Sequence, residues 1–119
     1  MAAGIRVHGI RNCDTMKKAR AWLDANGITY TFHDYKTEGV SRASLVKWCK
    51  ALGWEAVLNK AGATFRALPE ASRSNLTEDK AVELMLCQPS MIKRPMLETG
   101  DRVVVGFKPA LYETLFLKG

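Results

Sequence analysis

Cys13 is the residue whose type and setting point most directly to chemistry. It stands in a polar turn between an alternating apolar segment, Ile5–Ile10, and the start of a helical pattern. At a helix N-terminus several backbone N–H groups lack helical partners and the helix dipole is positive, which stabilises a thiolate, the nucleophilic form of cysteine. Arg11 and Lys17 add positive charge nearby in the sequence. We therefore predict that Cys13 is a reactive thiol rather than a small buried hydrophobic residue.

The spacing around Cys13 excludes several kinds of cysteine chemistry. A dithiol oxidoreductase would place a second cysteine three residues later, where this chain has Met16. A phosphatase-type phosphate loop would need an arginine six residues after the cysteine, where this chain has Ala19. What remains is a single nucleophilic thiol whose mixed disulfide must be resolved by another thiol. That second thiol is Cys49, Cys87 or an outside thiol such as glutathione.

The other cysteines and the histidines are expected to be structural. Cys49 and Cys87 lie within helical patterns beside large apolar residues, so we expect both to be buried or half-buried. His8 and His33 fall in predicted strands. No pair of these residues has the short spacing of a metal-binding motif, so no metal site is predicted.

The elements that must position Cys13 indicate an α/β fold. A strand, a helix and a strand come first, and strands joined by such a crossover should be parallel. A helical stretch follows, then a hairpin and a closing helix. The predicted segments are strand Ile5–Ile10, a helix ending at Asn26, strand Ile28–Asp34, helical residues 41–88, strand Met96–Glu98, the turn Thr99–Asp101, strand Arg102–Phe107 and a helix from Pro109. This order predicts a thioredoxin-like fold with a mixed four-stranded sheet.

The length of the chain predicts one domain. Its 119 residues fall within the usual size of a globular domain, and no internal repeat or linker interrupts them. The two sheet-forming parts, residues 4–40 and 91–119, would form the thioredoxin-like core. Residues 41–90 would be a helical insert.

Pro95 and Arg94 form a second informative segment because they directly precede the third predicted strand. In thioredoxin-like folds this place is held by a cis-proline that faces the reactive cysteine. Arg94 would then project toward Cys13. Its planar guanidinium could bind a carboxylate or an oxyanion through two hydrogen bonds.

The composition narrows the class of protein. Hydrophobic residues make up 47% and charged residues 25%, as in ordinary soluble proteins, and no apolar run approaches the roughly 20 residues of a membrane span. The net charge of +6 comes from scattered basic residues, so nucleic-acid binding is not expected. No secretory signal is visible at Met1–Gly4, and three widely spaced cysteines fit a reducing compartment. We expect a cytoplasmic protein without a membrane partner.

Two segments carry a family resemblance. These are Gly9–Ala19, which contains the turn Asn12–Thr15, and the later Lys93–Pro95. On these residues the chain resembles the ArsC/Spx family, and within it the small YffB-type proteins, over nearly its whole length. The resemblance implies a thioredoxin-like fold in which Cys13 attacks the substrate and glutathione or glutaredoxin regenerates it.

The arsenate reductases of that family surround the oxyanion with three arginines, and this chain departs from that pattern. Arg94 matches the arginine before the proline. The other two positions hold Asn59, followed by Lys60, and Lys108. Because lysine lacks the planar fork that grips a tetrahedral oxyanion, efficient arsenate reduction is not expected.

We therefore predict a glutathione-dependent thiol/disulfide or oxyanion reductase, glutaredoxin-like in chemistry, that acts on a small-molecule or protein disulfide. Glutathione is the expected co-substrate, and no bound cofactor is predicted. Cys13 would be the nucleophile, and the residues expected to bind substrate or glutathione are Asn12, Lys17, Lys60, Arg94, Pro95 and Lys108. The alternative is an Spx-like regulatory or redox-sensing interaction protein. Spx-type regulators often carry a second cysteine three residues after the first, which this chain lacks.

Overall fold

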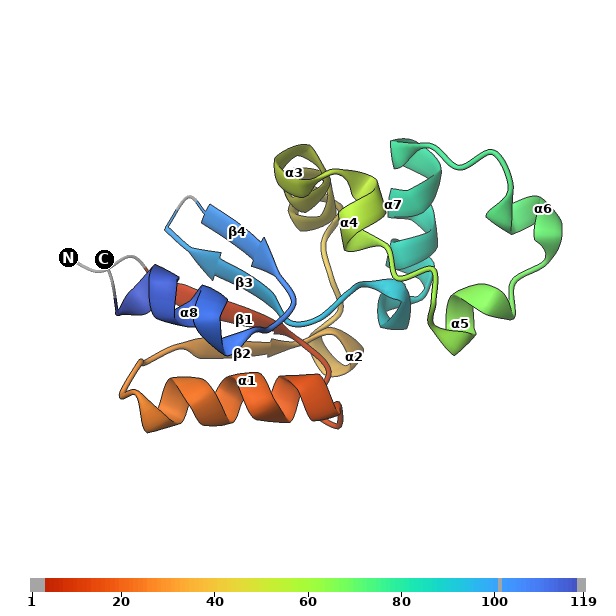
Figure 1. Ribbon diagram of the computed structural model, residues 1–119. Coiled ribbons are helices and arrows are strands. Elements are labelled where there is room, and N and C mark those ends of the chain that lie inside the picture. The colour runs from red at the N-terminus through yellow and green to blue at the C-terminus, as the bar shows by residue number, and fades with distance from the viewer. Residues whose placement is uncertain (1–3, 101, 118–119) are drawn as a thin grey trace. The chain divides into compact units, whose positions relative to one another are not determined.

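The computed structural model describes residues 4–100 and 102–117, and the contacts within it define two units. The first unit contains the chain up to Asp34 and from Arg94 onward, and the second contains Tyr35–Lys93. The elements are β1 Ile5–Gly9, α1 Asp14–Ala25, β2 Thr31–Asp34, α2 Tyr35–Glu38, α3 Arg42–Leu52, α4 Trp54–Val57, α5 Ala63–Arg66, α6 Glu70–Arg73, α7 Glu78–Cys87, the 3-10 helix η1 Pro89–Met91, β3 Met96–Thr99, β4 Arg102–Val105 and α8 Pro109–Phe116 (Figure 1).

The first unit is built on a four-stranded mixed sheet in the order β2-β1-β3-β4. Strands β1 and β2 are parallel, whereas β3 is antiparallel to both β1 and β4. Val7 in the centre of β1 lies opposite Phe32 on one side and Leu97 on the other. The predicted thioredoxin-like fold with a mixed four-stranded sheet is confirmed.

Helices α1 and α8 supply the core of the first unit from one face of this sheet (Figure 1). Helix α1 buries Met16, Ala19 and Leu23, which recur at the spacing of one helical face. Tyr112 of α8 packs into the same cluster and is fully buried. The cluster of buried residues consists of Val7, Met16, Ala19, Leu23, Leu97 and Tyr112. Since α1 and the sheet share this core, the start of α1 is fixed relative to β1.

The C-terminus of α1 explains why β2 begins later than predicted. The N–H of Gly27 donates to the carbonyl of Asp24, and the N–H of Ile28 donates to the carbonyl of Leu23. This hydrogen-bond pair is a Schellman motif, with Gly27 at a φ of 67°. Residues 28–30 therefore close the helix and turn toward the sheet, and the predicted strand Ile28–Asp34 is reduced to Thr31–Asp34.

The second unit is mostly helical, as predicted, and its longer helices begin at hydroxyl caps. The side chain of Ser41 accepts a hydrogen bond from the N–H of Ser44, and Thr77 accepts one from Lys80. Helix α3 ends at Gly53, whose φ of 89° suits only glycine without strain. No helix among residues 4–100 and 102–117 is long and apolar enough to cross a membrane.

Two further expectations are corrected by the structure. The predicted strand Arg102–Phe107 ends at Val105, because Gly106 turns the chain at a φ of 83° and donates its N–H to the carbonyl of Pro95. Cys87 is exposed rather than buried or half-buried. Helix α7 buries Ala81, Val82 and Met85, and a residue two positions after Met85 lies on the opposite side of the helix. Asp101, which ends the predicted turn, lies outside the described residues.

His8 and Glu98 form a buried pair in the first unit, and the pair predicts a pH-dependent stability. The Nε2 atom of His8 lies 2.7 Å from Oε1 of Glu98, and the ring contacts that of His33. Burial lowers the pKa of His8 from its usual value of about 6.5. The hydrogen bond to Glu98 and its charge raise this pKa, whereas His33 and Arg6 lower it, and the net effect is a lowered pKa. Below about pH 6.5 the unfolded chain therefore binds the proton more readily than the folded protein does.

We expect the free energy of unfolding to fall as the pH decreases below about 6.5, and to fall less in a His8→Gln variant. Urea unfolding of both proteins at about pH 7.5 and about pH 5.5 measures the effect. An identical pH dependence in the two proteins would show that His8 titrates equally in the folded and unfolded states.

Candidate active site

Cys13 is the N-cap residue of α1, as its place in the sequence predicted. Its φ of −132° and ψ of 129° are extended, and its carbonyl accepts the first helical hydrogen bond from the N–H of Lys17 at 2.9 Å. The turn that holds it joins the end of β1 to α1. Gly9, the last residue of β1, lies so close to α1 that an added Cβ would be 2.3 Å from the sulfur of Met16. The absence of a side chain at Gly9 leaves room for the Met16 side chain of α1 against the end of β1.

The surroundings of Cys13 favour the thiolate. Partial burial alone would raise the pKa of Cys13, but hydrogen bonding from the backbone N–H of Met16, from the Arg94 side chain and from the N–H of Thr15 lowers it, and the charge of Arg94 adds to this. The net result is a pKa of Cys13 below that of an ordinary thiol. Thr15 is the second and Met16 the third residue of α1, and the N–H groups at these positions have no helical carbonyl partner.

Arg94 reaches Cys13 from the far end of the sequence. It directly precedes the cis-proline Pro95, and β3 then runs beside β1. The predicted cis bond before Pro95 is confirmed. Arg94 therefore supplies a guanidinium at the Cys13 thiol, and such a planar donor can also bind a carboxylate or an oxyanion.

The two other cysteines differ from Cys13 in their settings. Cys49 is buried in α3, and burial is the main cause that raises its pKa to about 11. Cys87 is the last residue of α7 and is exposed. Among the described residues, Cys13 is therefore the cysteine at which a helix N-terminus and an arginine act together.

The order of thiol reactivity can be measured directly. We expect alkylation of Cys13 to reach half its maximal rate at a pH below the free-thiol value of about 8.5, whereas Cys49 should react only slowly and at much higher pH. Mass spectrometry of each labelled cysteine against pH measures the three thiols in one sample. A pKa of Cys13 at or above that of a free thiol would contradict the proposed environment.

The remaining predicted residues lie in different places. Asn12 and Lys17 are exposed and flank Cys13 in the turn and in the first turn of α1. Lys108 is exposed at the N-cap of α8. Lys60 belongs to the second unit, where its Nζ lies 5.1 Å from the centre of the Trp54 ring. Their roles in binding stay predictions.

Two residues whose backbone N–H groups lower the pKa of Cys13 were not identified from the sequence. The sequence predicts unpartnered backbone N–H groups at the start of this helix but does not say which residues carry them. In the structure these groups belong to Thr15 and Met16. The signal for the Met16 amide is its position three residues after the N-cap. Within the described ranges no group of three or more His, Cys, Asp and Glu side chains could hold a metal ion.

Comparison with known proteins places this chain in a family. The profile of the ArsC family matches residues 8–115, which include Cys13, Arg94 and Pro95. The chain belongs to the ArsC family. A solved structure of a YFFB protein is 57% identical, covers 92% of this chain and 96% of its own, and superposes with a TM-score of 0.91.

Two further relatives show how the ArsC family varies. An arsenate reductase (ArsC) related protein from Brucella melitensis is 56% identical, with 97% of this chain and 96% of that chain covered and a TM-score of 0.77. The global transcriptional regulator Spx of Streptococcus mutans is 26% identical over 98 residues, which are 81% of this chain and 71% of that protein. This chain is therefore an ArsC-family protein related to arsenate reductases, and it is also similar to a protein named as a transcriptional regulator.

Proposed function

We propose that this protein is a glutathione-dependent thiol/disulfide reductase that acts in the cytoplasm through Cys13. The observation that carries the proposal is the position of Cys13 at the N-terminus of α1 beside Arg94, a setting that lowers the pKa of the thiol. A lower pKa increases the fraction of thiolate at a given pH, and a thiolate attacks a disulfide sulfur much faster than a thiol does. Arg94 offers a fixed positive group to the carboxylates of glutathione.

The proposed reaction has two exchange steps. The Cys13 thiolate attacks the glutathione sulfur of a mixed disulfide, so that a Cys13–glutathione disulfide forms and the other sulfur leaves as a thiolate. The thiolate of a second glutathione then attacks the glutathione sulfur bound to Cys13. This releases oxidised glutathione and restores the Cys13 thiolate. The sulfur that leaves the mixed disulfide is thereby reduced to a thiol, and the sulfur of the one free glutathione that is consumed is oxidised. A single nucleophilic cysteine is sufficient for this cycle.

Turnover of a mixed disulfide of glutathione and 2-mercaptoethanol, with glutathione as the only reductant, tests the proposal. Formation of oxidised glutathione is the readout, and arsenate is offered in a parallel reaction. We expect the disulfide to be reduced and arsenate to be reduced poorly, because Asn59 and Lys108 stand where the family's arsenate reductases have arginines. Failure to turn over any mixed disulfide would refute the proposal.

The likeness to the regulator Spx supports a second candidate function. In that case the protein would be a regulatory or redox-sensing interaction protein, and Cys13 would be oxidised reversibly without turning over a substrate. Rapid peroxide oxidation of Cys13, combined with no disulfide turnover, is the result that would favour this candidate.

A further inference from the structure

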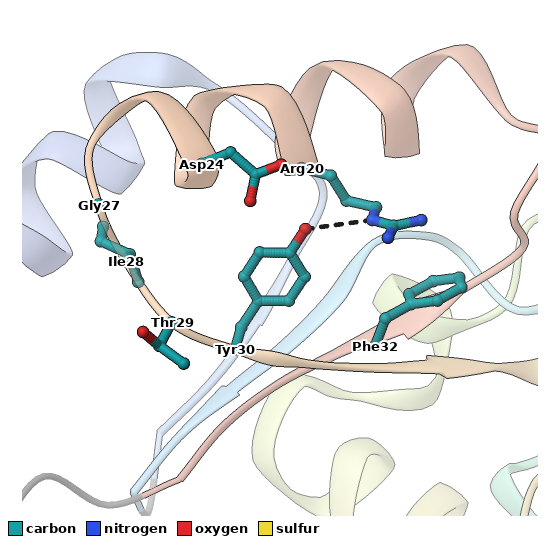
Figure 2. Close-up of a pocket in the computed structure, with 7 residues that line it drawn as sticks. All are labelled: Arg20, Asp24, Gly27, Ile28, Thr29, Tyr30 and Phe32. Carbon is teal, nitrogen blue, oxygen red and sulfur yellow. Dashed lines mark hydrogen bonds between the residues drawn. The ribbon is translucent and has the colours of Figure 1, made fainter.

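A groove outside the Cys13 site runs between α1 and the chain that leads into β2 (Figure 2). Its volume is about 540 Å³. Arg20 and Asp24 line it from α1, one helical turn apart, and Tyr30 and Phe32 line it from the strand side. Tyr30 and Phe32 are two positions apart, so both side chains point to the same face, as Figure 2 shows. All of these residues belong to the first unit.

Arg20 is held in one orientation within this groove. Its Nε donates a hydrogen bond of 3.1 Å to the hydroxyl oxygen of Tyr30, and its guanidinium carbon lies 4.3 Å from the centre of the Phe32 ring. Within the described residues its two terminal amino groups have no hydrogen-bond or carboxylate partner. Because Tyr30 accepts from Arg20, its own hydroxyl proton remains available to a ligand. The groove thus presents several donors whose positions are fixed before a ligand arrives.

The charges around the Phe32 ring favour an anionic ligand. Arg11 places a second guanidinium 5.5 Å from the centre of the same ring. Its Nε is 3.9 Å from Oδ2 of Asp34, which is a loose ion pair. Asp24 is the single acidic residue in the groove lining, and Figure 2 shows the Arg20 guanidinium extending away from it toward Phe32. Two arginine guanidinium groups therefore lie near this ring, Arg20 within the groove lining and Arg11 outside it.

The position of the groove also suits an extended chain. Strand β2 is an edge strand of the sheet, so within residues 4–100 and 102–117 one side of its backbone has no neighbouring strand. Arg20 is seven residues along α1 from Cys13, which corresponds to about 10 Å at the rise of an α-helix. An extended peptide covers this distance in about three residues. A segment bound to Arg20 could therefore present a sulfur to Cys13.

We propose that this groove binds an acidic side chain, Glu or Asp, of a protein disulfide substrate about three residues from its reactive cysteine. The proposal rests on the reductase function and specifies its substrate class. The carboxylate is bound by the terminal amino groups of Arg20 and by the Tyr30 hydroxyl. Arg11 contributes longer-range attraction.

Peptide binding tests this proposal without requiring turnover. The full chain with Cys13→Ser is titrated with a labelled peptide that carries one glutathionylated cysteine and either Glu or Gln three residues away, and fluorescence anisotropy is recorded. We expect the Glu peptide to bind about tenfold more tightly, because charge-assisted bonds to a fixed arginine are strong. Adding Arg20→Gln should remove that difference, and adding Tyr30→Phe should reduce it to about threefold.

The control variant is Arg102→Gln, which removes the same charge from the exposed start of β4 at the other edge of the sheet. It should retain the tenfold preference. Equal binding of the two peptides, or a preference that survives Arg20→Gln, would overturn the proposal. Tighter binding of a single-stranded oligonucleotide than of the Glu peptide, lost with Arg20→Gln, would overturn it in favour of a nucleic-acid site.

Turnover of the small mixed disulfide separates this proposal from the reductase function. Arg20→Gln in the otherwise unchanged protein should reduce the small substrate at the wild-type rate. If the unchanged protein reduces no disulfide but still prefers the Glu peptide through Arg20, the groove is supported and the reductase function fails.

Discussion

Replacing Cys13 by serine should lower disulfide turnover by about a thousand-fold or more, to the rate of the uncatalysed exchange. Serine occupies nearly the same volume and can cap a helix, so α1 should form normally. Its hydroxyl is neither ionised near neutral pH nor able to form a disulfide. Steady-state production of oxidised glutathione measures the loss, and circular dichroism checks the fold.

The other two cysteines serve as controls for this variant. Cys87→Ser should leave turnover unchanged because the Cys87 thiol is exposed at the end of α7. Cys49→Ala should also retain turnover, although it removes a buried sulfur and lowers stability somewhat. A large loss of turnover in either control, with Cys13→Ser still active, would show that Cys13 is not the nucleophile.

Arg94→Ala should have two separate effects, one on the pKa of Cys13 and one on glutathione binding. Because the side chain of Arg94 hydrogen-bonds to Cys13 and its charge favours the thiolate, the pKa of Cys13 should rise toward that of an ordinary thiol. If Arg94 also holds a glutathione carboxylate, glutathione binding should weaken by about 1.5–3 kcal/mol. Alkylation against pH reports the first effect and isothermal titration calorimetry the second.

Lys17→Ala is the matched comparison for Arg94→Ala. Lys17 is exposed in the first turn of α1, so its loss should weaken glutathione binding by only about 0–1 kcal/mol. Arg94→Lys should recover part of the pKa effect but less of the binding, since lysine lacks the two-pronged geometry. Equal small losses in the Arg94 and Lys17 variants would direct the search for the anion site to Lys60 and Lys108.

The architecture of the first unit could be predicted because its signals are local. The apolar residues of Ile5–Gly9 alternate with the period of a strand, whereas Met16, Ala19 and Leu23 recur with the period of a helix. The resulting strand-helix-strand order restricts the topology. Once the thioredoxin-like fold is predicted, Arg94 is expected near Cys13, because in such folds the proline before the third strand faces the reactive cysteine. Because Cys13 and Arg94 lie far apart in the sequence, their proximity could be predicted only through the topology of the fold.

Features that depend on packing could not be predicted in the same way. The exposure of Cys87 follows from which face of α7 is buried, and its apolar neighbour in the sequence does not reveal that face. The groove beside Arg20 arises because the side chain turns toward Phe32 and Tyr30 rather than toward Asp24, one helical turn away. In the sequence alone, Arg20 and Asp24 look like an ordinary exposed pair.

The order of the strands has a consequence for when the thiol becomes reactive during folding. The β1–α1–β2 segment and the β3–β4 hairpin join near neighbours in the chain, whereas the contact between His8 and Glu98 joins residues 90 positions apart. Contacts of such separation close late, because ordering the long intervening chain costs entropy. The N–H groups of Thr15 and Met16 can act on Cys13 as soon as α1 forms, but Arg94 arrives only when β3 pairs with β1. A chain in which β3 has not yet paired with β1 therefore carries a less acidic Cys13 thiol than the folded protein.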